Sequence, residues 1–270
     1  MNCIVRIASI FTLTLLSACA ASKVSLRDGP REYVPTDYED VSDNWTRTGD
    51  LITLSQLSSL LRATATFESW DFRWAYVIRY VEDYRLTLEQ RRKLLDQTLD
   101  ETQTSHRFFI AITGGERRFN DLTKPDSAWI VRLIDSTGNE IAPDEIIALK
   151  RPNVIERTYY PYITVFHRAF RVRFPRFNAE GKPTISDDAE WFGLRFAGAQ
   201  GSSELKWELD RDLPASQIKP KPPDPDKKAP ADAPAGASSP SAPPGSTKPD
   251  GAPVPPPAPS NDVKGTGPAP

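Results

Sequence analysis

The apolar residues of this chain change their spacing near His106. Before it they recur every three or four positions, as in amphipathic helices, and after it they form the short alternating or continuous runs that are typical of β-strands. No helical pattern separates these runs, so the parallel sheet of a βαβ protein is not indicated. We predict an α+β fold, an antiparallel, immunoglobulin-like β-sandwich with an N-terminal helical hairpin packed on it.

The residues from Thr53 onward predict a first helix. A capping-box pattern at Thr53 to Gln56 precedes Leu57, Leu61 and Ala65, which share one helical stripe with Leu54.

A helical hairpin is predicted to follow. In the first helix, the stripe through Trp70, Trp74 and Val77 is flanked by further aromatic residues, which predicts burial over more than half of its circumference. A second capping box at Thr87 opens the next helix, and the very short connection predicts an antiparallel pair. The leucines predicted to share a face of this helix are Leu88, Leu95 and Leu99.

Turn residues separate the strand-like runs. The segment Asp135–Asn139 and the segment Gly198–Gly201 each lie between apolar runs, as hairpin turns do. The runs themselves begin at Phe108, Trp129, Tyr162, Trp191 and Glu204.

The carboxy-terminal segment has a different composition. From Lys219 to Pro270, 17 of 52 residues are proline, and most of the others are small or charged. Such a segment cannot bury enough apolar surface to offset its ordering entropy, so we predict a disordered, Pro-rich tail with polyproline II character. Three roles stay open for it: reaching through a polymer mesh, presenting Pro253–Pro259 to an aromatic groove, or acting as an inert brush.

Catalytic and metal-binding signatures are sparse. The chain has two histidines, His106 and His167, and neither a G-x-S-x-G motif nor metal-ligand spacing, so we predict no metal, no cofactor and no enzyme activity. His106 is interpreted as a junction residue between helix and strand. Three acidic pairs leave a carboxylate-dependent hydrolase as a weaker alternative: Glu82-Asp83, Asp144-Glu145 and Asp187-Asp188.

A basic strand is the main candidate for ligand binding. Strand alternation from Tyr162 places Phe170, Val172 and Phe174 on one face, with Phe166 and Arg168, and it places His167, Arg171 and Arg173 on the other. This pattern fits a strand that faces the core on one side and carries solvated basic residues on the other. It also fits a binding site for an anionic envelope polymer. The net charge of −2 and the mixed signs along the chain predict no nucleic-acid partner.

The amino end has the layout of a secretory signal peptide. Arg6 precedes an apolar run from Ile7 to Leu16, which is too short to span a bilayer as a helix. The four residues Leu16-Ser17-Ala18-Cys19 that follow resemble the lipobox of bacterial lipoproteins. The alternative is ordinary cleavage after Ala20, which would leave a soluble exported protein.

The resemblance implies that Cys19 becomes the first mature residue and carries a diacylglyceryl thioether and an amide-linked acyl chain, such as palmitate. Several chains give stable anchoring where a single chain does not. Ala20 is not aspartate, which in Gram-negative members implies sorting to the outer membrane. Because Cys3 leaves with the signal peptide, no disulfide is expected within the mature chain.

The chain between residues 45 and 209 also resembles uncharacterised Gram-negative envelope lipoproteins, to which no activity is assigned. The segments that carry this resemblance are "ATATFESWDFRWAYVIRY", "FFIAI", "WIVRL" and "LRFAGAQGSSELKWEL".

We therefore predict a lipid-anchored protein of the bacterial cell envelope with a structural or protein-interaction role. A binding module for peptidoglycan or another envelope polymer is the alternative. The acidic segment around Asp37 and Asp43 lacks the order of a calcium loop and is interpreted as a solvated spacer. The predicted plan is a signal peptide at 1–18, a lipidated cysteine and polar spacer at 19–50, a helical segment at 51–105, a β-sandwich at 106–216 and the tail at 217–270.

Overall fold

The computed structural model describes residues 22–53, 58–115 and 120–212. The predicted signal peptide, Cys19 and the Pro-rich segment lie outside these residues. The chain divides into two units, Met1–Pro222 and Pro223–Pro270, and the second unit contains no described residue. In chain order the elements are η1 (Pro35–Asp37), α2 (Tyr38–Trp45), β1 (Thr46–Thr53), β2 (Ser58–Phe67), α3 (Trp70–Tyr84), α4 (Leu88–Thr104), β3 (Ser105–Thr113), β4 (Ile130–Asp135), β5 (Glu140–Ile141), β6 (Glu145–Leu149), α5 (Val154–Tyr159), β7 (Arg168–Pro175), β8 (Trp191–Gly198) and β9 (Gly201–Glu208).

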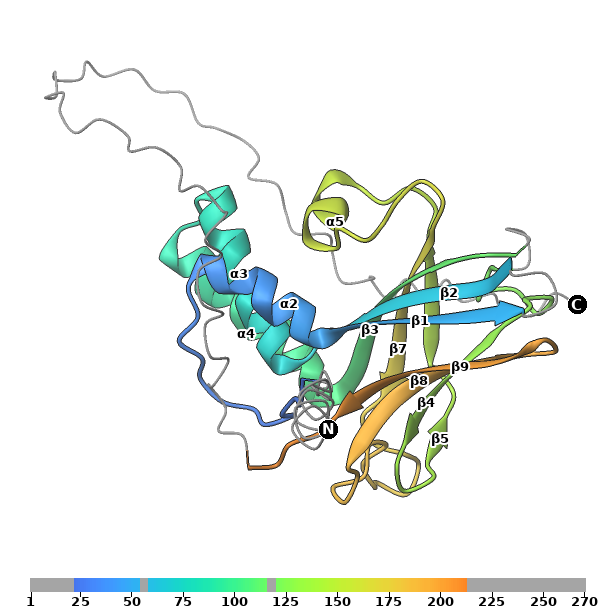
Figure 1. Cartoon of the computed structure of the whole chain (residues 1–270). Helices are drawn as coiled ribbons and strands as arrows, with labels where there is room; N and C mark the ends of the chain where they lie inside the picture. The colour runs from blue at the N-terminus through green and yellow to red at the C-terminus, as the bar shows by residue number, and fades with distance from the viewer. Residues whose placement is uncertain (1–21, 54–57, 116–119, 213–270) are drawn as a thin grey trace, which may run out of the picture. The chain divides into compact units, whose positions relative to one another are not determined.

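The fold is α+β with a β-rich core (Figure 1). One antiparallel sheet has the order β1-β2-β3-β7-β6, and the second has the order β5-β4-β8-β9. The edge strands β1 and β9 lie side by side, because a Cβ at Gly49 would meet the side chain of Leu205.

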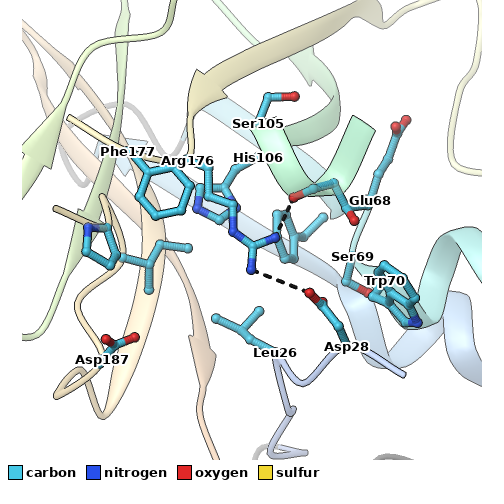
Figure 2. A pocket seen from close by; sticks show the side chains of 14 residues that line it. Leu26, Asp28, Glu68, Ser69, Trp70, Ser105, His106, Arg176, Phe177 and Asp187 are labelled. Carbon is cyan, nitrogen blue, oxygen red and sulfur yellow. Dashed lines mark hydrogen bonds and ion pairs between the residues drawn. The ribbon is translucent and has the colours of Figure 1, made fainter. Parts of the chain in front are cut away.

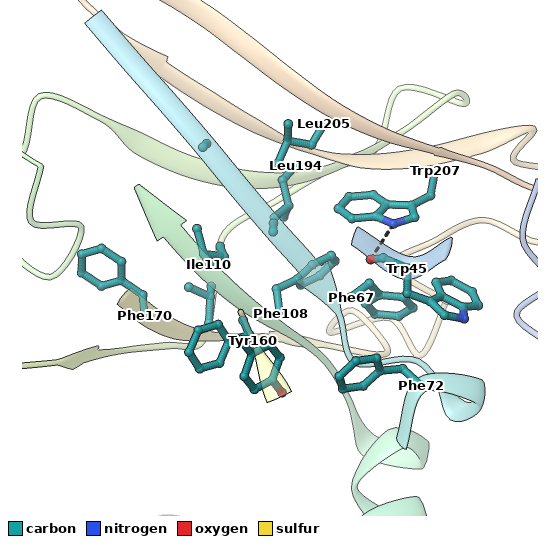
Figure 3. Packing of buried hydrophobic residues seen from close by; sticks show 14 of the residues in the cluster. Trp45, Phe67, Phe72, Phe108, Ile110, Tyr160, Phe170, Leu194, Leu205 and Trp207 are labelled. Carbon is teal, nitrogen blue, oxygen red and sulfur yellow. Dashed lines mark hydrogen bonds between the residues drawn. The ribbon is translucent and has the colours of Figure 1, made fainter. Parts of the chain in front are cut away.

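Aromatic rings join the two sheets (Figure 3). The Phe67 ring of the first sheet lies 5.1 Å from the Phe192 ring of the second, and the Phe108 ring lies 5.7 Å from the Trp207 ring. The indole N–H of Trp207 donates to the carbonyl oxygen of Trp45 at 3.0 Å, so this buried polar group is satisfied. The core therefore runs from the end of α2 through both sheets.

The helical hairpin is confirmed. The Ser69 hydroxyl caps α3, and the predicted capping box at Thr87 and Gln90 opens α4. Between the two helices Arg85 takes a positive φ of 52°, which ends α3 in the left-handed region.

The buried faces of the hairpin match the prediction in part. Val77 of the predicted stripe and the flanking Phe72 and Tyr80 are buried in α3, whereas Trp70 and Trp74 are only partly covered. Phe72 contacts Tyr160, which follows α5, and Tyr80 contacts Tyr159 of α5. Helix periodicity alone does not reveal these partners. In α4, Leu99 is buried and Leu95 partly buried, but Leu88 is 82% exposed.

The prediction of a helix from Thr53 to Ala65 is wrong where the structure describes it. Thr53 ends β1, and Leu61 and Ala65 are buried on one face of β2 together with Ala63 and Phe67. Residues four apart share a face in a helix and also in a strand, because four is a multiple of the strand period of two. The spacing of Leu61 and Ala65 therefore fits both structures, while Leu54 and Leu57 lie outside the described residues.

The interpretation of residues 19–50 as a solvated spacer is wrong for its described part. Tyr38, Val41 and Trp45 are buried along α2, and β1 starts at Thr46. The acidic side chains around Asp37 and Asp43 obscured this helix, although the buried residues follow helical spacing.

The strand predictions are confirmed at β3, β4, β8 and β9, and the segments at Asp135–Asn139 and Gly198–Gly201 form the expected hairpin turns. The run from Tyr162 becomes a strand only at Arg168. Its first part instead lies against the sheet, where the Tyr162 hydroxyl donates to the carbonyl oxygen of Phe109 at 3.2 Å. Phe166, predicted to face the core, is 75% exposed in this loop.

Candidate functional site

A pocket of about 370 Å³ lies where the amino-terminal segment meets the ends of several strands and helices (Figure 2). This volume falls in the range of small-molecule sites. Its wall comes from the β2–α3 junction, the α4–β3 junction, the β7–β8 connection and residues 26 and 28. The lining residues are Leu26, Asp28, Phe67, Glu68, Ser69, Trp70, Thr102, Ser105, His106, Arg176, Phe177, Pro183, Ile185 and Asp187.

Arg176 ties three parts of the wall together. Its guanidinium donates to the carbonyl oxygen of Thr102 at 2.6 Å and lies 3.6 Å from the Asp28 carboxylate. The Gln103 amide also donates to Asp28, at 2.9 Å. The cation is thus engaged by wall residues, and Figure 2 shows it between α4 and the amino-terminal segment.

His106 lies at the junction of α4 and β3, as predicted, and its ring packs 5.8 Å from the Phe67 ring. Burial, with a further contribution from the Arg176 charge, lowers the pKa of His106 to about 3, so the imidazole is neutral near pH 7. Within the described ranges its ring nitrogens have no hydrogen-bond partner. The imidazole is therefore available to a ligand as a donor or an acceptor.

The hydroxyl groups of the lining are engaged elsewhere. Ser69 accepts from the backbone N–H of Phe72, Thr102 donates to the carbonyl oxygen of Leu99, and Ser105 donates to that of Glu101. Among the residues that the structure describes, none of these hydroxyls contacts His106. The described lining residues therefore do not form the hydroxyl–imidazole pair of a nucleophilic enzyme.

The His106→Gln variant is expected to lose part of the acid sensitivity of the fold. Because the folded-state pKa lies below the unfolded value of 6.5, the unfolded chain takes up this proton first, and stability falls as the pH drops below about 6.5. The native chain should lose about 2 kcal/mol more than the variant between pH 7.5 and pH 5, as measured by urea unfolding. His167→Gln is the control: its loss of stability between pH 7.5 and pH 5 should be closer to that of the native chain than the loss of His106→Gln is. Equal pH profiles for the native chain and His106→Gln would contradict the assignment.

An ion-pair network adjoins the pocket at Glu68. Its carboxylate lies 2.9 Å from Arg73 and accepts from the Tyr160 hydroxyl at 2.8 Å. Arg73 and Arg107 both lie 2.7 Å from Glu101, which joins α3, α4 and β3. Burial alone would raise the pKa of Glu68, but the nearby charges of Arg73 and others and the Tyr160 hydrogen bond hold it below its usual value. The two carboxylates and the two guanidinium groups of this network balance in charge and connect α3, α4 and β3 next to the pocket.

The predicted basic site is not gathered into one cluster. Arg171 and Arg173 share the partly exposed face of β7, but Arg171 lies 2.9 Å from Glu156 and Arg173 lies 3.6 Å from Glu145. His167 lies beyond the other end of the strand, where its ring is 2.8 Å from the Thr164 hydroxyl. Sequence reasoning missed Arg107, which is paired with Arg173 across β3 and β7. Carboxylates therefore accompany both of the predicted binding arginines.

The three acidic pairs lie on different elements. Glu82 and Asp83 form ion pairs along α3, Glu145 pairs with Arg173 on β7, and Asp188 lies 3.9 Å from Arg211. Asp187 is the member that reaches the pocket lining. None of the other five acidic residues lines this pocket.

Of the pocket residues, the sequence singled out His106 and Asp187, but nothing in it indicated that they share a site with Asp28 and Arg176. Asp28, Arg176 and Asp187 come from three irregular segments, and only the folded chain brings them together.

No group of three His, Cys, Asp or Glu side chains suited to a metal ion occurs among the residues described. None of the described helices has both the length and the apolar character needed to cross a bilayer.

Comparison of the chain with protein-family models, with curated proteins and with solved structures gave no match. The assignment of a function therefore rests on the chain's own sequence and geometry.

Proposed function

We propose that this protein is a lipoprotein of the bacterial cell envelope, anchored in the outer membrane through lipid on Cys19, with a structural or protein-interaction role rather than a catalytic one. The lipobox-like residues 16–19 at the end of the apolar run support the anchor. The pocket favours binding, since its hydroxyl groups are engaged by backbone and none of the described hydroxyl groups contacts His106.

The observation that carries this proposal is how close to Cys19 the described contacts of the domain lie. The Arg47 guanidinium donates to the carbonyl oxygen of Ser22 at 3.0 Å, and the backbone N–H of Val24 donates to the carbonyl oxygen of Glu208 at 2.8 Å. Ser22, three residues after Cys19, already takes part in these contacts. Cleavage before Cys19 would remove none of them.

We infer a β-sandwich from the aromatic contacts between the two sheets, in which rings of β2 and β3 meet rings of β8 and β9. An immunoglobulin-like arrangement stays a prediction from the sequence.

Lipidation is tested with a clickable palmitate analogue in growing cells. The native chain and Cys3→Ser should both incorporate the label, because Cys3 lies inside the predicted signal peptide. Cys19→Ser should lose the label completely. Label retained in Cys19→Ser, or absent from the native chain, would refute the anchor.

A binding module for peptidoglycan or another envelope polymer is the alternative, with His167, Arg171 and Arg173 as its contacts. The ion pairs of both arginines weaken it, because a polyanion would have to displace Glu156 and Glu145. Co-sedimentation with purified peptidoglycan that is abolished by Arg171→Ala together with Arg173→Ala would favour this alternative.

A further inference from the structure

The first described residues lie against one particular edge of the domain. Val24 is 1% exposed and forms a parallel bridge with Leu209, directly after β9. The backbone N–H of Asp210 donates to the carbonyl oxygen of Val24 at 2.9 Å, which closes this bridge from the other side. The Ser22 hydroxyl also contacts the Asn44 side chain at the end of α2.

Arg47 connects this segment to both sheets. Besides the bond to Ser22, its guanidinium donates to the carbonyl oxygen of Lys206 at 3.1 Å and to that of Asn44 at 2.8 Å. Arg47 belongs to β1 and Lys206 to β9, the neighbouring edge strands of the two sheets (Figure 1). The β1–β9 edge, meaning the neighbouring edge strands β1 and β9, therefore holds the chain from Ser22 onward through the start of β1 and the end of β9.

The remaining tether is short. Cys19 is three residue steps before Ser22, and three extended steps span at most about 11 Å. The opposite edge of the first sheet is β6, four strand spacings from β1, which amounts to about 19 Å. The tether is shorter than the width of the sheet. If Cys19 is anchored in the bilayer, β6 therefore cannot face the bilayer while the β1–β9 edge points away from it.

We propose that the β1–β9 edge faces the phospholipid surface and that β6 and α5 are displayed away from it. This inference rests on the proposed lipidation of Cys19 and adds the orientation of the domain. It places Val154, Val165 and Phe166, which are 79%, 66% and 75% exposed, on the displayed side next to β6 and β7. It also places the pocket, which Leu26 and Asp28 line, on the side of the anchor.

The orientation is tested with single fluorescent labels on the full lipidated chain. The sequence has no cysteine besides Cys3 and Cys19, so cysteines introduced at exposed positions are labelled selectively. Glu208→Cys marks the end of β9, and Lys150→Cys marks the residue after β6. Both proteins are reconstituted in vesicles of phosphatidylethanolamine and phosphatidylglycerol that contain a lipid with a short-range quencher on its headgroup.

The label at Glu208→Cys should be quenched at least about twofold more strongly than the label at Lys150→Cys, given the separation of the two edges. Insertion of twelve Gly and Ser residues between Ala21 and Ser22, which adds a span of about 20 Å, should reduce this difference. Equal quenching at both positions, or stronger quenching at Lys150→Cys, in protein that sediments with the vesicles would overturn the orientation alone. Failure of the native chain to sediment with the vesicles would overturn the proposed anchor and the orientation with it.

Discussion

Replacing Trp207 with alanine is expected to lower the free energy of unfolding by about 3–5 kcal/mol. The Trp207 side chain is fully buried, stacks on Phe192 at 5.4 Å and contacts Phe108 of the other sheet. Its removal leaves a cavity between the sheets and an unpaired carbonyl oxygen at Trp45. Urea unfolding, followed by circular dichroism, measures the effect.

Trp191→Ala is the matched control, because Trp191 lies on the neighbouring strand β8 and is partly exposed. The Nζ atom of Lys206 lies 4.1 Å from the centroid of the Trp191 ring, a cation–π contact worth about 1 kcal/mol or less. Comparable losses in the two variants would show that Trp207 does not link the sheets as described.

Replacing Arg31 with methionine is expected to lower the free energy of unfolding by about 3–5 kcal/mol, because it leaves the buried carboxylate of Asp71 without its cationic partner. The Arg31 side chain is fully buried and pairs with Asp71 at the start of α3. It also donates to the carbonyl oxygen of Gly29 at 2.7 Å. The guanidinium thus holds the amino-terminal segment against the helix, and amides of residues 22–34 should exchange faster with solvent in the variant.

Arg85→Met tests whether the loss of any arginine ion pair has this effect. Arg85 is 81% exposed in its pair with Glu82, and exposed pairs contribute about 1 kcal/mol or less. An Arg31→Met variant that is as stable as Arg85→Met, with unchanged exchange at residues 22–34, would contradict the role given to the amino-terminal segment.

Local patterns predicted the elements whose signals are local. The α3–α4 hairpin has its own caps, and β3 and β8 have strand-like runs between turn residues, so the sequence identifies them without knowledge of the partners. The helix predicted at Leu61 and Ala65 failed because a spacing of four suits both a helix and a strand.

Long-range pairing accounts for what the sequence did not reveal. Val24 looks like an isolated apolar residue in a polar stretch, and only its bridge to Leu209 makes it part of the fold. The pocket depends in the same way on Asp28 meeting Arg176. The predicted binding residues Arg171 and Arg173 were placed on the correct strand face, but their carboxylate partners come from α5 and β6, which strand alternation does not show.

The mass of the intact mature chain, purified from membranes in detergent, tests the central claim most directly. The account predicts a chain that begins at Cys19 and carries the mass of a diacylglyceryl group and an additional acyl chain. An unmodified chain that begins at Ala21 would contradict it.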